Sequence, residues 1–345
     1  MQRCLQLAVL GKANVAPNPM VGSVLVFDNR IIGEGYHKQY GQAHAEVNCI
    51  NSVSDIDTQL IPYSTLYVSL EPCAHFGKTP PCTDLIIRNN IKNVVIGCND
   101  SFKEVSGKGI EKLTQHGVTV IVGVLENECK DLNKRFFTFH DKQRPFIILK
   151  WAETANRKIS AVTNERLLIS NGFSNRLVHK WRNEEVAILV GTSTALLDNP
   201  TLTNRLWHGK SPIRLVIDKY LKLPTDLHLF DKQQPTIVFN FIKHEAQANL
   251  TFQLLDKAEN LIEQILQICY QLNIQSILVE GGAQLLQSII DHGLWDEVRV
   301  IRNEDLIVND GLDAPVLRDQ LLINKEQLFS DSITYFSNKN NSNKA

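Results

Sequence analysis

Alternation of strand-like and helix-like segments is the feature of this chain that most restricts its fold. Apolar, β-rich runs stand at residues 65–70, 93–98 and 118–122, and amphipathic segments at 82–90 and 109–115 lie between them. A hairpin pattern with a turn at Asp28 precedes this series, a helix is expected from His44, and a charged helix is expected after Glu126. Such alternation predicts a sheet covered by helices on both faces. We therefore expect an α/β domain with three layers, αβα.

A second alternation follows a break in the chain. The polar stretch DKQRP ends at Pro145 and is typical of a linker. We therefore expect one domain at residues 1–142, a linker at 143–145 and a second domain at 146–336, which the length of 345 residues allows. Strands are expected in FIILKWA, VAILVG, PIRLVID, PTIVFN and SILVEGG, and helices in NGFSNRLVHKWRNE, ENLIEQILQICYQL and AQLLQSIIDHG. The polar residues 337–345 are expected to be disordered.

Composition argues against several classes of partner. The formal net charge is -1, whereas proteins that bind nucleic acid or membrane surfaces usually present a basic field. No signal peptide is recognisable, and no apolar run approaches the roughly 20 residues that cross a bilayer. Seven cysteines, an odd number without framework spacing, indicate a reducing compartment. We expect a cytoplasmic protein with neither a nucleic-acid nor a membrane partner.

His44, Cys73 and Cys82 form a candidate set of metal ligands. They belong to the strings HAE and EPCAHFGKTPPC, and Cys82 is expected at a helix start, where a thiolate is favoured. A catalytic zinc takes three imidazole or thiolate ligands and keeps one position for water. Hydrolytic deamination also needs a carboxylate that moves protons without binding metal, and Glu46 suits that task. A lone histidine or buried cysteine is usually ordinary, but the order of these strings predicts a zinc deaminase.

Two segments of the second half are weaker signals. A buried strand ends at Glu280, two glycines follow and a helix begins, which is a geometry that lets backbone N–H groups meet a phosphate. Without context, however, such a glycine pair more often marks only a tight turn. The hydroxyl-rich segment VGTSTALLDNPTLTNR is likewise typical of caps and turns. On these residues alone, nucleotide binding stays open.

The spacing of the two cysteines suggests a family. Common nucleoside and polynucleotide deaminases place two residues between the cysteines, whereas eight, AHFGKTPP, intervene here. Together with PNPMVG and HAEVNCI, this loop resembles the deaminase half of the bifunctional deaminase-reductases of riboflavin biosynthesis. In the second half, LKWAET, the pattern G-x-x-T-x-x-x-D-[DN]-P-x-L-x-x-R, PIRLVID and VEGG resemble the reductase half in the same order. The resemblance covers nearly all of the chain and implies a cytidine-deaminase-like domain followed by a dihydrofolate-reductase-like domain.

The resemblance also implies roles for residues, carried over position by position. The residues implied to bind the deaminase substrate are Asn18, His75 and Lys78. Those implied to contact NADPH are Ala152, Leu168, Thr194, Asp198, Gly282, Ala283, Gln284, Leu285, Leu286, Gln287 and Ser288. Those implied to contact the reductase substrate are Lys150, Arg166, Arg182, Leu202, Arg205 and Glu280. A cationic cluster is sensible because arginine forks match phosphate oxygens.

The implied function consists of two steps on a small phosphoribosyl pyrimidine. With Zn²⁺, the first half would hydrolyse the 2-amino group of 2,5-diamino-6-(ribosylamino)-4(3H)-pyrimidinone 5'-phosphate. With NADPH, the second half would reduce the ribosyl group to ribityl, and the family's association through its reductase halves implies a homo-oligomer. Two alternatives stay open: a nucleobase or nucleoside deaminase whose second domain only mediates assembly, and a non-catalytic binding protein. The intact Glu46 argues against the latter, because the fold does not need that acid.

Several positions depart from the family pattern, all in the second half. Where the family commonly reads S-L-D-G, this chain has Thr154, Ala155, Asn156 and Arg157. Leu168 stands where a tryptophan is frequent, and Arg166 replaces a small polar substrate contact. These differences therefore concern the expected reductase activity and not the expected deaminase activity.

Overall fold

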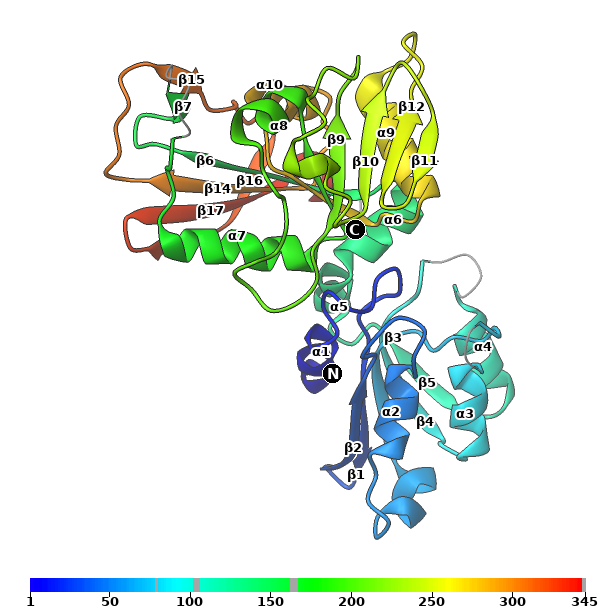
Figure 1. Ribbon diagram of the computed structural model, residues 1–345. Coiled ribbons are helices and arrows are strands. Elements are labelled where there is room, and N and C mark those ends of the chain that lie inside the picture. The colour runs from blue at the N-terminus through cyan, green and yellow to red at the C-terminus, as the bar shows by residue number, and fades with distance from the viewer. Residues whose placement is uncertain (78–79, 102–105, 162–166, 343–345) are drawn as a thin grey trace. The chain divides into compact units, whose positions relative to one another are not determined.

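Two compact units make up the computed structural model, Met1–Gln143 and Arg144–Ala345 (Figure 1). The structure describes all residues except 78–79, 102–105, 162–166 and 343–345. No helix within the described ranges combines the length and the apolar character that a membrane span requires. Each unit has its own sheet and its own hydrophobic core.

The first unit contains a five-stranded sheet with the order β2-β1-β3-β4-β5. β1 pairs antiparallel with β2 and β3, while β3, β4 and β5 are parallel. Its elements are α1 (Gln2–Val9), β1 (Gly22–Phe27), β2 (Arg30–Tyr36), α2 (Ala45–Asn51), the 3-10 helix η1 (Thr58–Tyr63), β3 (Thr65–Leu70), α3 (Cys82–Arg88), β4 (Asn93–Cys98), α4 (Lys108–Gln115), β5 (Thr119–Val122), α5 (Glu126–Leu132) and α6 (Lys134–Lys142).

Side chains on both faces of this sheet are covered. Leu25 and Leu66 belong to a core cluster that includes residues of α2, α3 and α4. Their chain neighbours Val24 and Tyr67 point to the opposite face, as alternate residues of a strand do, and pack with α1. The expected three-layer αβα domain is confirmed.

The second unit is built on a ten-stranded sheet with the order β11-β12-β10-β9-β8-β13-β6-β14-β17-β16. The strands from β12 to β14 in this order are mutually parallel, so their carboxyl ends share one edge. The elements up to β12 are β6 (Phe146–Glu153), β7 (Lys158–Ala161), α7 (Gly172–Glu184), β8 (Ala187–Val190), α8 (Thr192–Asp198), β9 (Ile213–Ile217), η2 (His228–Phe230), β10 (Thr236–Asn240), β11 (Glu245–Gln247) and β12 (Leu250–Leu254). Those that follow are α9 (Leu261–Gln271), β13 (Ser276–Val279), α10 (Ala283–Asp291), β14 (Glu297–Asn303), β15 (Gly311–Asp313), β16 (Gln320–Leu328), β17 (Asp331–Asn338) and α11 (Lys339–Ser342).

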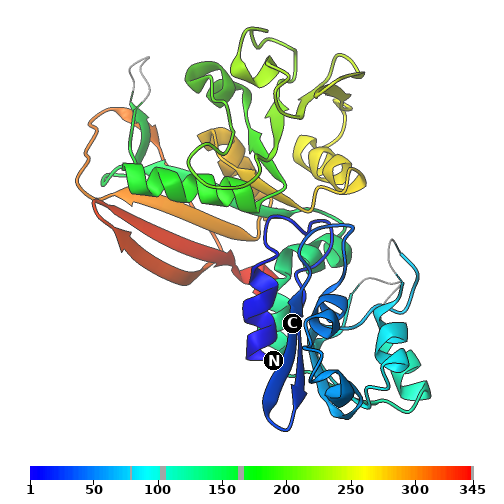
Figure 2. The same cartoon turned by 60° about the horizontal axis from the view of Figure 1, so that its bottom comes forward.

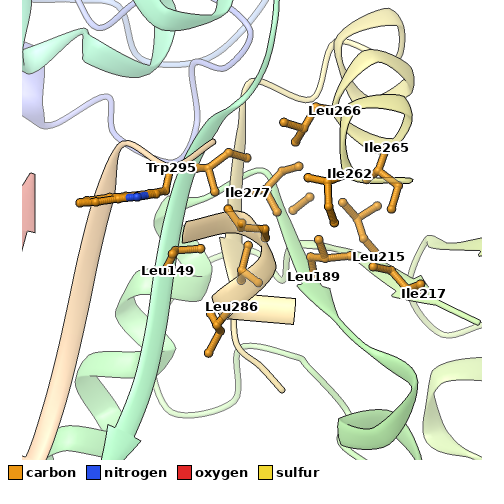
Figure 3. Packing of buried hydrophobic residues seen from close by; sticks show 14 of the residues in the cluster. Leu149, Leu189, Leu215, Ile217, Ile262, Ile265, Leu266, Ile277, Leu286 and Trp295 are labelled. Carbon is orange, nitrogen blue, oxygen red and sulfur yellow. The ribbon is translucent and has the colours of Figure 1, made fainter. Parts of the chain in front are cut away.

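Helices pack on both faces of the large sheet as well. α9 and α10 bury Ile265 and Leu286 against strand residues such as Leu149 and Ile277 (Figure 3). On the other side, α7 runs alongside β14 and β17 (Figure 2) and packs Trp181 with Ile148 and other residues of the sheet. This mixed α/β sheet is consistent with the expected dihydrofolate-reductase-like domain.

Two local expectations are corrected. The hydroxyl-rich segment after β8 is not only a loop, because Thr192–Asp198 forms α8, and the hydroxyl of Thr192 donates to the carbonyl of Ile217 at 2.6 Å. Disorder from residue 337 is wrong for residues 337–342, because β17 runs to Asn338 and α11 follows. The buried amide of Asn338 donates to the carbonyl of Trp295 at 2.9 Å. The polar composition of the C-terminal segment does not reveal this hydrogen bond.

Candidate active sites

His44, Cys73 and Cys82 converge in the first unit. One ligand atom from each lies within 4.8 Å of the others. Nδ1 of His44 lies 3.6 Å from Sγ of Cys73 and 3.4 Å from Sγ of Cys82. His44 is the N-cap residue of α2 rather than part of its first turn, and Cys82 is the first residue of α3. One imidazole and two thiols at this spacing fit a catalytic zinc, which takes three such ligands.

Glu46 is the second residue of α2 and lies beside this cluster. Its side chain is almost fully buried, with the residue only 3% exposed. Burial raises the pKa of Glu46, and the neighbouring His44 partly opposes that effect. A carboxyl with a raised pKa holds and releases a proton more readily near neutral pH, which suits an acid-base group.

His37 is a buried histidine that the sequence patterns did not indicate. Its side chain holds Asn18, one of the predicted substrate residues. Its Nδ1 lies 3.0 Å from the carbonyl of Ala43, so this nitrogen carries the hydrogen. Nε2 then accepts from Nδ2 of Asn18 at 3.1 Å, which fixes the orientation of the Asn18 amide. The His37 ring lies 5.4 Å from the ring of His44. Its position directly after β2 was the only available sequence signal.

The two other predicted contacts for the deaminase substrate belong to the loop between the cysteines. His75 is half-buried there. Lys78 lies outside the described residues.

An ion cluster joins three of the predicted reductase residues. The carboxylate of Glu280, directly after β13, accepts from Nε and Nη2 of Arg182 at 2.7 and 2.8 Å. Nζ of Lys150, on the adjacent strand β6, lies 3.8 Å from the same carboxylate. Burial alone would raise the pKa of Glu280, but the charges of Arg182 and Lys150 outweigh it and lower the pKa to about 2. Glu280 is therefore a buried carboxylate at neutral pH.

Two of the remaining predicted substrate residues, Leu202 and Arg205, lie in the connection between α8 and β9. Arg205 donates from its guanidinium to the hydroxyls of Thr201 and Thr203. Its backbone N–H donates to Nδ1 of the buried His179, on α7, at 2.9 Å. Leu202 is 2% exposed and packs in a core cluster, so its side chain serves the fold. Arg166 lies outside the described residues.

Gly281 and Gly282 form a close contact with a predicted cofactor residue. A Cβ atom built on either glycine would lie 3.2 Å from Oγ1 of Thr194, and Gly281 has a φ of 135°, which side chains disfavour. Gly282 is the N-cap of α10 and makes no side-chain cap, so the first N–H groups of that helix are available to a ligand. A nucleotide phosphate fits such a backbone cradle.

The other predicted cofactor residues divide into two groups. Leu286 belongs to the core, and Gln287 exchanges hydrogen bonds with the backbone of Val316, so both side chains have partners within the protein. Leu168 is 76% exposed. Gln284, on α10, is exposed. The rest are half-exposed residues of β6, α8 or α10: Ala152, Asp198, Ala283, Leu285 and Ser288.

The departures at residues 154–157 form an ordered turn between β6 and β7. The Thr154 hydroxyl donates to Oδ1 of Asn156 at 2.7 Å, and Nδ2 of Asn156 donates to the carbonyl of Val308 at 2.8 Å. Arg157 adopts a φ of 63° and donates to the carbonyl of Pro315 at 3.1 Å. The left-handed conformation explains why a glycine is common at this position in the family.

Comparisons with known proteins cover both units. Residues 1–98 match the cytidine and deoxycytidylate deaminase zinc-binding region, and residues 145–304 match the RibD C-terminal domain. Riboflavin biosynthesis protein RibD of Aquifex aeolicus is 37% identical, over 97% of both chains. RibD of Escherichia coli is 32% identical, over 90% of this chain and 88% of that protein.

A solved structure agrees along the whole length. The diaminohydroxyphosphoribosylaminopyrimidine deaminase/5-amino-6-(5-phosphoribosylamino)uracil reductase of Thermotoga maritima superimposes with a TM-score of 0.89. It is 38% identical, and the match covers 98% of this chain and 97% of that one. With a zinc-binding deaminase domain followed by a RibD C-terminal domain, the chain belongs to the RibD family of riboflavin biosynthesis proteins.

Proposed function

We propose that this chain deaminates 2,5-diamino-6-(ribosylamino)-4(3H)-pyrimidinone 5'-phosphate and then reduces the ribosyl group of the product with NADPH. The observation that carries the proposal is the convergence of His44, Cys73 and Cys82 beside the buried Glu46. The Thermotoga maritima relative, which matches both units, is described by the corresponding pair of activities. This support disfavours a deaminase whose second domain only mediates assembly.

In the deaminase step, His44, Cys73 and Cys82 would hold zinc. When bound, zinc supplies an activated water as the nucleophile. Glu46 would carry one proton of the attacking water to the ring nitrogen and the other to the departing amine. A C–O bond forms, the C–N bond breaks and ammonia leaves. Asn18, His75 and Lys78 would bind the base and the phosphate, with His37 holding the Asn18 amide.

In the reductase step, NADPH, when bound, would supply a hydride to C1' of the ring-opened sugar. The C=N bond would become a C–N single bond as its nitrogen takes a proton from solvent, and NADP⁺ would leave. The backbone at Gly281 and Gly282, together with the first turn of α10, would hold the cofactor phosphates, and Thr194 would face them. Lys150 and Glu280 would orient the hydroxyls of the sugar chain. Arg205 would meet the substrate phosphate, because its guanidinium lies on the surface and carries the matching charge.

Self-association through the reductase unit is also part of this proposal. β16 is an edge strand whose residues are exposed almost throughout, including Leu321, Leu322 and Ile323, which are 41%, 63% and 53% exposed. An apolar edge strand with unpaired backbone groups is suited to pairing with a second copy of the chain. The oligomer should therefore dissociate in Leu322→Lys, which light scattering after gel filtration would detect. A cytoplasmic location is supported by the seven cysteines, none of which forms a disulfide.

An assay of both steps on the purified chain tests the function. We expect ammonia release from the diamino substrate and NADPH oxidation that depends on the deaminated product. Ammonia release without NADPH oxidation would instead favour the assembly-domain alternative. Arg205→Ala should damage only reduction, and an equal loss of deamination would contradict the two-site model.

A further inference from the structure

Helix α7 runs beside the connection from α8 to β9, residues 199–212, which we call the Arg205 loop (Figure 1). Nη1 of Arg182 donates to the carbonyl of Thr203 at 3.1 Å. Nζ of Lys180 lies 5.9 Å from the ring centroid of Trp207, in the same loop. The loop is therefore positioned by side chains from the C-terminal half of α7.

The third contact, from His179, is with Arg205 itself. His179 is 1% exposed, and its Nδ1 lies 2.9 Å from the backbone nitrogen of Arg205. A backbone N–H can only donate, so Nδ1 must carry a lone pair and the ring must be neutral, with its hydrogen on Nε2. The side chain of Arg205, in turn, is held by hydroxyls of its own loop. The place of the guanidinium therefore follows from the place of the loop.

We propose that His179 is a positioning residue of the reductase site, which fixes the Arg205 loop by accepting the backbone N–H of Arg205. This inference rests on the proposed role of Arg205 as a contact for the substrate phosphate. Without the acceptor, this part-buried N–H either loses its hydrogen bond or moves the loop to find another partner. Both outcomes weaken binding of the substrate more than they slow the hydride transfer. The KM for the deaminated substrate should therefore rise while kcat changes little.

Two substitutions separate this role from simple packing. In His179→Asn, the amide oxygen can occupy the place of Nδ1, so the acceptor is retained. In His179→Gln, the polar atoms reach the place of Nε2, and the acceptor at Nδ1 is lost. We expect His179→Gln to raise the KM about tenfold, the equivalent of roughly 1.4 kcal/mol, and His179→Asn to restore most of the affinity. His228→Gln, which changes an exposed histidine of the same unit, is the matched control and should leave the KM unchanged.

A second measurement reports on the loop without catalysis. Amide hydrogen exchange at Arg205 should accelerate in His179→Gln and stay slow in His179→Asn, with the wild-type chain as reference. Ammonia release by the same preparations should not change, because that site lies in the other unit, and thermal unfolding checks that the variants fold.

Equal KM values for the wild type and His179→Gln, or an equal rise in both variants, would overturn the positioning role. A wild-type chain that does not reduce the deaminated substrate at all would overturn the proposed function instead. Slower exchange at Arg205 in His179→Gln than in the wild type would also contradict the inference.

Discussion

The guanidinium of Arg182 donates two hydrogen bonds, at 2.7 and 2.8 Å, to the carboxylate of Glu280 in the interior of the second unit. The two side chains are only 12% and 7% exposed. The pair links the C-terminal part of α7 to the carboxyl end of β13, where cofactor and substrate are proposed to meet. It therefore belongs both to the fold and to the site.

Replacing Arg182 by alanine should leave the charge of Glu280 buried with only Lys150 nearby. Removing one partner of a buried ion pair costs about 3–5 kcal/mol, so the unfolding free energy of the reductase unit should fall by roughly that amount. Urea unfolding measures the loss. Arg176→Ala, which removes an exposed arginine from the same helix, is the control, and a similar small loss in both variants would contradict the prediction.

Stability of the reductase unit should decrease in mild acid because of His179. Burial, together with the charges of Arg182 and Arg205, lowers the pKa of His179 to about 4, whereas Glu280 opposes this effect and Lys150 adds to it. The unfolded chain, with an ordinary pKa of about 6.5, binds the proton more readily between these values. The contribution of His179 is thus complete above about pH 6.5 and is lost as the pH falls towards 4. Between neutral pH and pH 5, the unfolding free energy measured with urea should fall less for His179→Asn than for the wild type. An equal fall in both proteins would refute His179 as the origin of the acid sensitivity.

Glu71 should matter for zinc retention although it is not a ligand. Its carboxylate accepts from the backbone N–H groups of Asp100, Gly107, Gly109 and Ile110, at 2.9 to 3.4 Å. Glu71→Ala leaves these donors without their acceptor, so the segment that leads to the cysteine ligands should loosen, at a cost of about 1–3 kcal/mol. Transfer of zinc to a chelator should be faster than in the wild type. Glu111→Ala, on the exposed side of α4, should lose zinc at the wild-type rate.

Asn156 should be a structural replacement for the family's acidic residue. It bridges Thr154 and the backbone of Val308. We expect Asn156→Ala to lower the unfolding free energy by about 1 kcal/mol, because the three side-chain hydrogen bonds of Asn156 in this exposed turn are lost. Asn156→Asp keeps the acceptor for Thr154 and should lose less. If both variants unfold like the wild type, the side chain does not hold this turn.

The local zinc signature was readable from the sequence because each of its residues occupies a defined place next to a strand or a helix. Cys73 follows β3, Cys82 starts α3 and His44 caps α2, so the order of elements brings them together. The alternation of patterns similarly indicated the three layers of the first unit. These features depend on short segments, which sequence patterns describe well.

Contacts between distant segments could not be read in the same way. His179 and Arg205 approach each other through the packing of a loop on α7, and no spacing of residues encodes that contact. Asn338 is buried by a hydrogen bond to Trp295, although its surroundings in the sequence are polar. Likewise, Leu202 and Leu286 match a family pattern but have side chains in the core. Tertiary packing decided these cases, not local composition.

The most direct test of the account is Glu46→Ala, with zinc content, ammonia release and NADPH oxidation measured on the same preparation. Because Glu46 is placed as the proton carrier and not as a ligand, the variant should keep its zinc and lose ammonia release. It should still oxidise NADPH when the deaminated intermediate is supplied. Loss of the metal, or loss of the reductase step along with deamination, would contradict the account.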